Sequence, residues 1–108
     1  MAKHDDLRKY LPLTEATYYI MLTLIEPRHG YAVMQQVEKL SEGTIKVGPG
    51  TLYGVFSTLE KEGLIRKVKE EERRKYYLLT LKGKEVLSAQ VKRLEIMTRN
   101  GLELNLHS

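Results

Sequence analysis

The strongest constraint on the fold is the segment at residues 46–65, which combines a helical apolar pattern with glycines in its interior. It reads KVGPGTLYGVFSTLEKEGLI. Four apolar residues recur at the i, i+3, i+4 and i+7 spacing of one helix face: Leu52, Val55, Phe56 and Leu59. Pro49 suits the first helical turn, and Gly63 suits the position just past the end. The segment therefore predicts a short amphipathic helix with one buried stripe.

The face opposite this stripe is small, hydroxyl-bearing and basic. It carries Gly50, Gly54, Ser57 and Lys61, with Thr51, Tyr53 and Thr58 at its flanks. Solvated helix faces normally carry long charged side chains, and each interior glycine costs roughly 0.5–1 kcal/mol relative to alanine. The loss of side chains on this face indicates that something bulky must approach the helix closely.

The other patterns predict three more helices, a short strand and a β-hairpin. The first helix begins after Thr14 as N-cap and is stopped by Pro27, and Thr80 caps the last one. In chain order we expect a helix over 11–26, a helix over 31–40, a short strand over 45–47 and then the glycine-containing helix. Two strands follow, over 64–69 and 74–80, joined by a polar tip at 70–73. A last helix comes after them and stops at Asn100-Gly101. Residues 102–108 receive no assignment.

This order of elements is typical of a winged helix-turn-helix, a mainly α fold with a small β-hairpin wing. In that architecture the third helix enters the DNA major groove, and short outward residues let its backbone approach base edges and phosphates. The wing carries Arg73, Arg74 and Lys75, which would track phosphates or enter a minor groove. We expect a DNA-binding domain over 1–80, followed by a C-terminal dimerisation helix and tail over 81–108.

Composition excludes several classes of protein. The chain has 108 residues, enough for one compact domain, and no cysteine, which excludes disulfides, thiolate metal sites and a cysteine nucleophile. Its histidines, His4, His29 and His107, are scattered, and no catalytic motif occurs, so we expect neither an enzyme nor a metal or cofactor site. The charged N-terminus and short apolar runs predict a cytoplasmic protein without a membrane span. A net charge of +4 only mildly favours a nucleic-acid partner.

Three segments carry a resemblance to a known family: HGY at 29–31, GPGTLYGVFSTLEKEGLI at 48–65 and RRKYYLLTLKGKEVL at 73–87. Together they resemble the PadR family of bacterial transcriptional regulators, from about Leu13 to Leu94, in its short form with one C-terminal helix. The resemblance implies DNA contacts at Tyr31, Gly50, Thr51, Tyr53, Arg74 and Lys75. Gly48 departs from the serine of many relatives and removes a hydroxyl that could touch phosphate.

With the outward positions of the third helix and the wing, the predicted DNA-contacting set is Tyr31, Gly50, Thr51, Tyr53, Ser57, Lys61, Arg73, Arg74 and Lys75. Each has a simpler alternative. The tyrosines could fill gaps between helices, and the wing cations could pair with the glutamates at 70–72. His29 is interpreted as a turn residue bonded to the backbone.

The resemblance also implies a homodimer in which the last helix packs against the first helix of a second subunit. Independently, the first helix is apolar over too much of its circumference for one core, and the last has an apolar seam without a core of its own. The predicted interface comprises Tyr18, Met21, Leu22, Ile25, Leu87, Val91, Leu94 and Met97. A twofold dimer would present two recognition helices to a near-palindromic operator.

Two hypotheses remain beside a DNA-binding repressor. The resemblance implies that a small aromatic or apolar effector can occupy the dimer interface, where methionines adapt to varied shapes, although Met21 and Met97 are more simply core residues. The rival function is a winged-helix module for protein association, or a small-molecule-binding dimer with little DNA affinity. The small, basic outward face of the third helix favours DNA, because a protein partner would favour large exposed apolar residues there.

Overall fold

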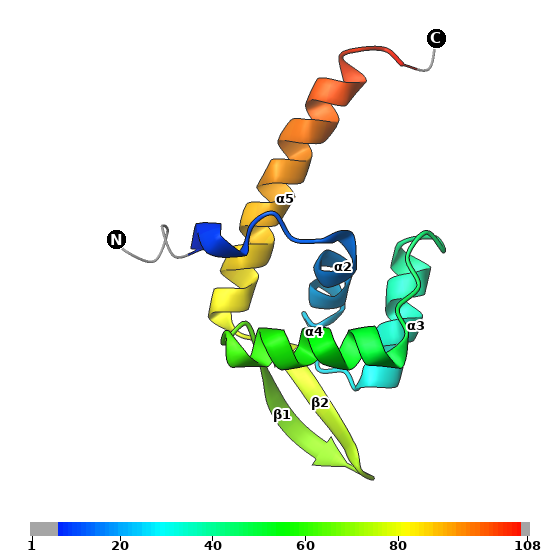
Figure 1. Ribbon diagram of the computed structural model, residues 1–108, viewed down its shortest axis with the longest axis vertical. Coiled ribbons are helices and arrows are strands. Elements are labelled where there is room, and N and C mark those ends of the chain that lie inside the picture. Colours follow the sequence, from blue (N-terminus) through cyan, green and yellow to red (C-terminus); the bar gives the residue numbers. More distant parts are fainter. Residues whose placement is uncertain (1–6, 107–108) are drawn as a thin grey trace.

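The computed structural model describes residues 7–106 and is a helical body with a two-stranded antiparallel sheet projecting from it (Figure 1). Its elements are the 3-10 turn η1 (Arg8–Tyr10), α2 (Glu15–Thr23), α3 (Gly30–Leu40), α4 (Pro49–Lys61), β1 (Ile65–Glu71), β2 (Arg74–Leu79) and α5 (Leu81–Leu102). The predicted fold class, a mainly α winged helix-turn-helix with a small hairpin wing and a long last helix, is confirmed. Residues 1–6 and 107–108 of the predicted domains, including His4 and His107, lie outside the described residues.

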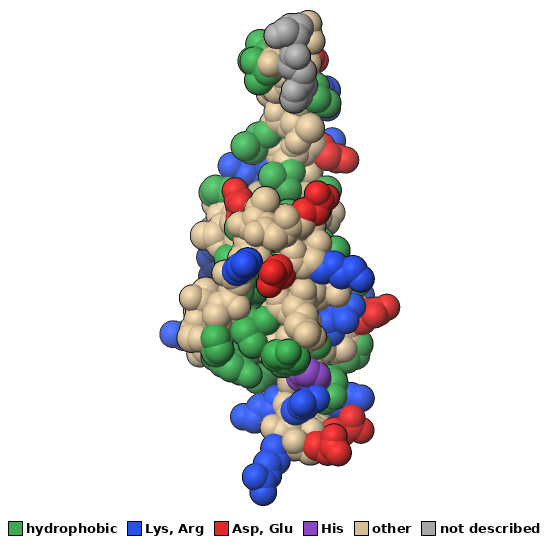
Figure 2. All heavy atoms as spheres, turned by 90° about the vertical axis from the view of Figure 1, so that its right-hand side faces the viewer, with side chains coloured by type: hydrophobic (Ala, Val, Ile, Leu, Met, Phe, Trp, Pro, Cys, Tyr) green, Lys and Arg blue, Asp and Glu red, His purple; other side chains and the backbone are tan. Residues whose placement is uncertain are grey.

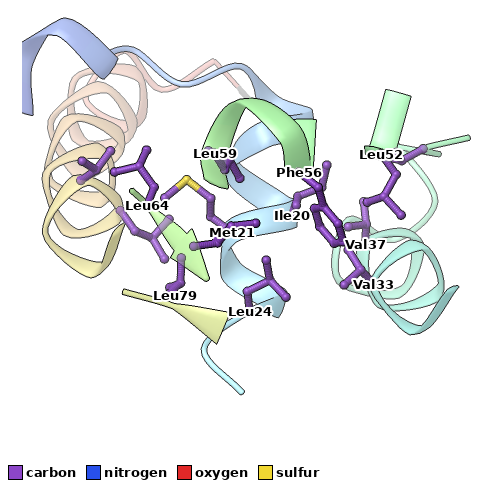
Figure 3. Packing of buried hydrophobic residues seen from close by; sticks show 14 residues of the cluster. Ile20, Met21, Leu24, Val33, Val37, Leu52, Phe56, Leu59, Leu64 and Leu79 are labelled. Atoms are coloured by element: carbon purple, nitrogen blue, oxygen red, sulfur yellow. The ribbon is translucent and has the colours of Figure 1, made fainter. Parts of the chain in front are cut away.

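The core is organised around α2, which packs against both α3 and α5. Ile20, Met21 and Leu24 of this helix have no exposed surface. Figure 3 shows Ile20 beside Phe56 of α4, and Met21 on the side of Leu64 and Leu79. The predicted stripe of α4 is confirmed, since three of its four residues are buried and the fourth is half-buried: Leu52, Phe56, Leu59 and Val55.

Side chains define where α2 and α5 begin. Thr14 Oγ1 accepts the Thr17 N–H at 3.1 Å, and Thr80 Oγ1 accepts the Gly83 N–H at 3.0 Å, as predicted for both N-caps. The first helix is nevertheless shorter than predicted, covering 15–23 and not 11–26. Its expected first turn is instead non-helical, because the Leu13 N–H donates to Gln90 Oε1 of α5 at 2.8 Å.

The strand predicted at 45–47 is wrong. The Ser41 hydroxyl accepts the Ile45 N–H at 3.0 Å and donates to the Ile45 carbonyl at 3.2 Å, which folds this segment into a loop. The edge of β2 is occupied instead by Arg28, whose N–H donates to the Tyr77 carbonyl at 3.1 Å and whose carbonyl accepts the Tyr77 N–H at 2.9 Å. A segment of three residues forms no strand when it has no free edge to pair with.

The wing, defined as the β1–β2 hairpin, covers 65–79 against the predicted 64–80, and its tip has two residues where four were predicted. Glu72 and Arg73 at this tip both have positive φ, 50° and 68°. That conformation matches the twist of the flanking strands but usually selects Asn-Gly. An irregularity between Lys67 and Lys69 interrupts the register. The wing projects away from the body below α4 (Figure 1).

The last helix has two different halves. Gly83, Val86, Leu87 and Gln90 of its first half are buried, and the second half leaves the body (Figure 1). A Cβ on Gly83 would overlap the Leu64 carbonyl oxygen, so the close contact with the residue before β1 requires glycine. The helix runs to Leu102, just past its predicted stop. No helix within residues 7–106 is long and apolar enough to cross a membrane.

Candidate nucleic-acid interface

The outward face of α4 is open. A Cβ built on Gly50 or Gly54 would meet no atom within 4 Å, so packing within the protomer requires neither glycine. Ser57, Thr51 and Lys61 on the same surface are exposed. Gly48 begins the helix without any side-chain hydrogen bond, which leaves the first amides of α4 uncapped. This end of α4 presents backbone donors and small side chains to whatever lies outside.

The two predicted tyrosines, Tyr31 of α3 and Tyr53 of α4, have most of their surface exposed. Tyr31 is 59% exposed and its hydroxyl accepts from Gln35 Nε2 at 3.3 Å. Tyr53 is 57% exposed, and its ring meets Phe56 edge-on with centroids 6.0 Å apart. Its hydroxyl lies so close over Gly30 that a Cβ there would be 2.6 Å away. Packing thus orients both rings while leaving each of them free to contact a ligand.

The wing tip carries three exposed cations, Arg73, Arg74 and Lys75. The hypothesis that the neighbouring glutamates pair with these cations is wrong. Glu70 pairs with Lys67 at 3.4 Å, and Glu71 pairs with Lys69 at 3.3 Å. Across residues 7–106, no carboxylate lies within ion-pair distance of the three tip cations. The lysines of β1 therefore neutralise Glu70 and Glu71 and leave the cations at the wing tip to a partner.

A groove of about 390 Å³ separates α3 and α4 from the wing. We call it the wing groove; it is lined by His29, Gly30, Tyr31, Tyr53, Phe56, Arg73, Arg74, Lys75 and Tyr77. It unites the two tyrosines and three wing cations predicted from the sequence. A second hollow of about 300 Å³ lies along the other flank of α4, where it is lined by Gly50, Thr51 and Gly54 among others. Ser57 and Lys61 line neither hollow.

His29 is the site residue whose position sequence reasoning missed. It is bonded to the backbone as predicted, because its Nδ1 accepts the Ala32 N–H at 3.4 Å and caps α3. It also reaches the wing: Nε2 lies 3.5 Å from Arg74 Nη1, and the ring meets Tyr76 edge-on at 5.2 Å. Burial, and then the positive charge of Arg74, lower the pKa of His29 below 6.5, so it is neutral at pH 7. Its signal in the sequence was its place directly before the second helix.

Tyr76 and Tyr77 are adjacent in β2 and both half-buried, but they pack on different neighbours. Tyr77 packs on Phe56 with ring centroids 4.8 Å apart. Burial, and then the carboxylate of Glu60, raise the pKa of Tyr77 above 10.0, so its hydroxyl stays protonated. Tyr76 instead lies under the Lys69 ammonium, which is 4.6 Å from the ring centroid. Both rings therefore brace the wing against α3 and α4.

The projecting half of α5 forms a separate apolar surface. Figure 2 shows hydrophobic side chains along this upper part, whereas Lys and Arg side chains, with some acidic ones, gather over the wing below. A groove of about 550 Å³, called here the α5 groove, runs along it and is lined by Tyr18, Val91, Leu94, Glu95, Thr98, Arg99, Leu102 and Glu103. The groove brings together three residues of the predicted interface, Tyr18 of α2 with Val91 and Leu94 of α5.

Two predicted interface residues need correction. Met21 is fully buried in the protomer's own core, so its interpretation as a core residue is right and its place at an interface is wrong. Leu87 is only 8% exposed and also packs within the protomer. Met97 is 63% exposed, so the core interpretation is wrong for this methionine. Ile25 is exposed and Leu22 is half-buried, and neither lines the α5 groove.

Comparison with known proteins identifies relatives over most of the chain. The family model described as the transcriptional regulator PadR-like family matches residues 20–89. An uncharacterized protein X of Lysinibacillus sphaericus is 31% identical over an alignment of 113 positions, which covers 95% of this chain and 100% of that protein. An uncharacterized 37.1 kDa protein in a Streptomyces fradiae transposon is 38% identical over 64 residues, or 59% of this chain, which span only 18% of that protein.

Solved structures of PadR-like proteins have the same fold as this chain. A PadR-like transcription factor from Bacteroides fragilis is 28% identical, with a TM-score of 0.67 over 94% of this chain and 96% of that chain. A PadR-like transcriptional regulator from Bacillus cereus, 23% identical, shares the fold with a TM-score of 0.71 over 94% of this chain and 97% of that one.

Proposed function

Since the chain belongs to the PadR-like family of transcriptional regulators, which are not enzymes, we propose that it is a cytoplasmic, homodimeric repressor that binds a near-palindromic operator through α4 and the wing. The observation that carries this proposal is the outward face of α4, where Gly50 and Gly54 face open space although packing needs neither. A helix that gives up two side chains on its exposed face is built for the close approach of a large ligand.

Three features support docking of α4 in a major groove. The glycines let the helix backbone approach, while Thr51 and Tyr53 carry hydroxyl groups that can reach base edges or phosphates. The amides after Gly48 lack a side-chain cap, and the positive end of the helix dipole lies behind them. A backbone phosphate would satisfy those amides, as anions do at other helix starts.

The wing supplies the electrostatic part of binding. Arg73, Arg74 and Lys75 have no carboxylate partner in the part of the chain that is described, so a phosphate would not have to displace an internal ion pair. Each phosphate that a cation neutralises releases counterions and steepens the dependence of affinity on salt. The wing would therefore contribute affinity, and α4 would contribute sequence preference.

We further propose that α5 forms the dimer. Apolar side chains of its projecting half are exposed, Met97 at 63% and Leu102 at 67%. Tyr18 of α2 and the exposed Ile25 just after this helix, both from a second copy, fit this need. Twofold symmetry would place two α4 helices about 34 Å apart, one turn of DNA. Sedimentation equilibrium should find a dimer, and a monomer at micromolar concentration would contradict this assembly.

The α5 groove is also the place for an apolar effector. Its volume of about 550 Å³ falls within the range of small-molecule sites, about 300–1,000 Å³. A ligand bound at the junction of two subunits would change the separation of the two α4 helices. It would release the operator if it favoured a separation that does not match one turn of DNA. An aromatic ligand is the first choice because Tyr18 lines the groove.

Fluorescence anisotropy tests the DNA proposal. The protein is titrated into labelled DNA from upstream of its own coding sequence, and into scrambled DNA, at several salt concentrations. Tighter binding to the upstream DNA with a steep salt dependence supports a sequence-reading repressor. Equal binding to both DNAs contradicts sequence reading at this operator, and binding to neither favours a protein-association module.

A further inference from the structure

Two hydrogen-bond donors approach the imidazole of His29 from opposite sides. The Ala32 N–H points to Nδ1 at 3.4 Å, and Arg74 Nη1 lies 3.5 Å from Nε2. A neutral imidazole has one N–H and one lone pair, and a guanidinium has donors only. The ring can therefore accept from Ala32 or from Arg74, but not from both.

The lone pair belongs at Nδ1. The Ala32 amide is held in the first turn of α3, whereas Arg74 is an exposed side chain that can turn. The lowered pKa of His29 keeps the ring neutral, so the remaining proton lies on Nε2. The Nε2–H and the Arg74 guanidinium then face the same space as two hydrogen-bond donors.

The surroundings of this donor pair suit an anion. Arg73 and Lys75 line the same groove, and the Tyr31 hydroxyl provides another polar group there. Tyr76 holds the imidazole edge-on, so the ring cannot swing freely away from the wing. Among residues 7–106, Arg74 has no ion pair that would compete for its charge. The groove itself, about 390 Å³, has room for a phosphate group.

We propose that His29 Nε2–H and the Arg74 guanidinium jointly bind one oxygen of a DNA-backbone phosphate at the mouth of the wing groove. This site rests on the proposed function, because the phosphate is that of the bound DNA. It links α3 to the wing through the ligand and sets the angle at which the wing meets the duplex. Inorganic phosphate has the same chemistry, so it serves as a probe that is independent of any operator.

The first test uses a variant that separates helix capping from phosphate binding. His29→Asn keeps a good N-cap for α3, but its shorter side chain cannot place an N–H beside Arg74. We expect an unchanged Tm and an affinity lowered about tenfold on both operator and scrambled DNA, the effect of one hydrogen bond to a charged group. Unchanged affinity on DNA that the wild type binds would overturn the site.

The second test asks whether the two residues act on one phosphate. Arg74→Gln should weaken binding and reduce the salt slope by about 1. The double variant with His29→Asn should then lose less than the product of the two single losses. Arg93→Gln, on the projecting half of α5, is the control for the loss of a positive charge, and should leave the affinity unchanged. A double-variant loss equal to that product would overturn shared binding.

The third test needs no DNA. Imidazole ¹⁵N spectra should show Nδ1 unprotonated, and inorganic phosphate should shift the Nε2 signal of His29 in the wild type but not in Arg74→Gln. Such a shift in a protein that binds no DNA would overturn the proposed function and support the anion site. If the wild type binds DNA but inorganic phosphate leaves His29 unshifted, the anion site is wrong and the proposed function stands.

Discussion

The first turns of α5 and the outward face of α4 both contain a glycine inside a helix, for opposite reasons. At Gly83 the carbonyl oxygen of Leu64 occupies the space where a Cβ would be, so the fold itself requires glycine. At Gly54 a Cβ would meet nothing within 4 Å. A costly residue that the protomer does not require indicates a requirement outside the protomer. The comparison thus separates residues kept for folding from residues kept for a partner.

The largest effect on stability should come from Gly83→Ala. The overlapping atom belongs to the backbone of Leu64 and cannot turn aside, so we expect a loss of about 1–3 kcal/mol in the free energy of unfolding. Urea denaturation measures it. Gly101→Ala is the matched control in the same helix, because a Cβ there meets open space and should cost nothing. A Gly83→Ala protein as stable as the wild type would break the comparison.

Gly30→Ala should have an intermediate effect. Its new Cβ would come within 2.6 Å of the Tyr53 hydroxyl, at the far end of a mobile side chain. We expect Tyr53 to turn aside, with a stability change below about 1 kcal/mol and clearly weaker DNA binding. Tyr53→Phe removes the overlapping oxygen, so Gly30→Ala should be better tolerated in that background. Equal costs in both backgrounds, measured by urea denaturation, would contradict the contact.

The smallest effect concerns the pH dependence of stability. The pKa of His29 is lowered in the folded protein, so its contribution to stability is complete above the unfolded value of about 6.5 and is lost as pH falls from there through the folded value. The wild type should therefore lose slightly more stability than His29→Asn between pH 7 and pH 5. Thermal unfolding of both proteins across this range measures the difference. Parallel curves would show that His29 does not titrate as described.

Local sequence patterns predicted the helices and the hairpin well, because each of these elements is marked by its own residues. The stripe of α4 follows helical periodicity, and Thr14 and Thr80 are good N-caps. The strand at 45–47 failed because β2 is paired at its edge by Arg28, which is distant in the sequence. The same limit hid the contact between His29 and Arg74, which are 45 positions apart.

The two methionines show a different limit. Periodicity cannot decide which side of an apolar helix faces its own core. Met21 and Met97 were therefore each interpreted both as a core residue and as an interface residue. Met21 is buried in the core, whereas Met97 is exposed. The ion pairs of the wing were also beyond sequence reasoning. Lysines and arginines were equally near to the glutamates along the chain, and the strand geometry selected Lys67 and Lys69.

The most direct test of the central claim is a paired measurement on Gly54→Gln, the Tm and the affinity for the upstream DNA. Glutamine is uncharged and a good helix former, so in the open space at this position it should raise stability by roughly 0.5 kcal/mol. Its side chain would keep DNA away from α4, and affinity should fall at least tenfold. A protein with raised Tm and lost DNA binding is the predicted result. Unchanged affinity would show that the outward face of α4 does not contact DNA.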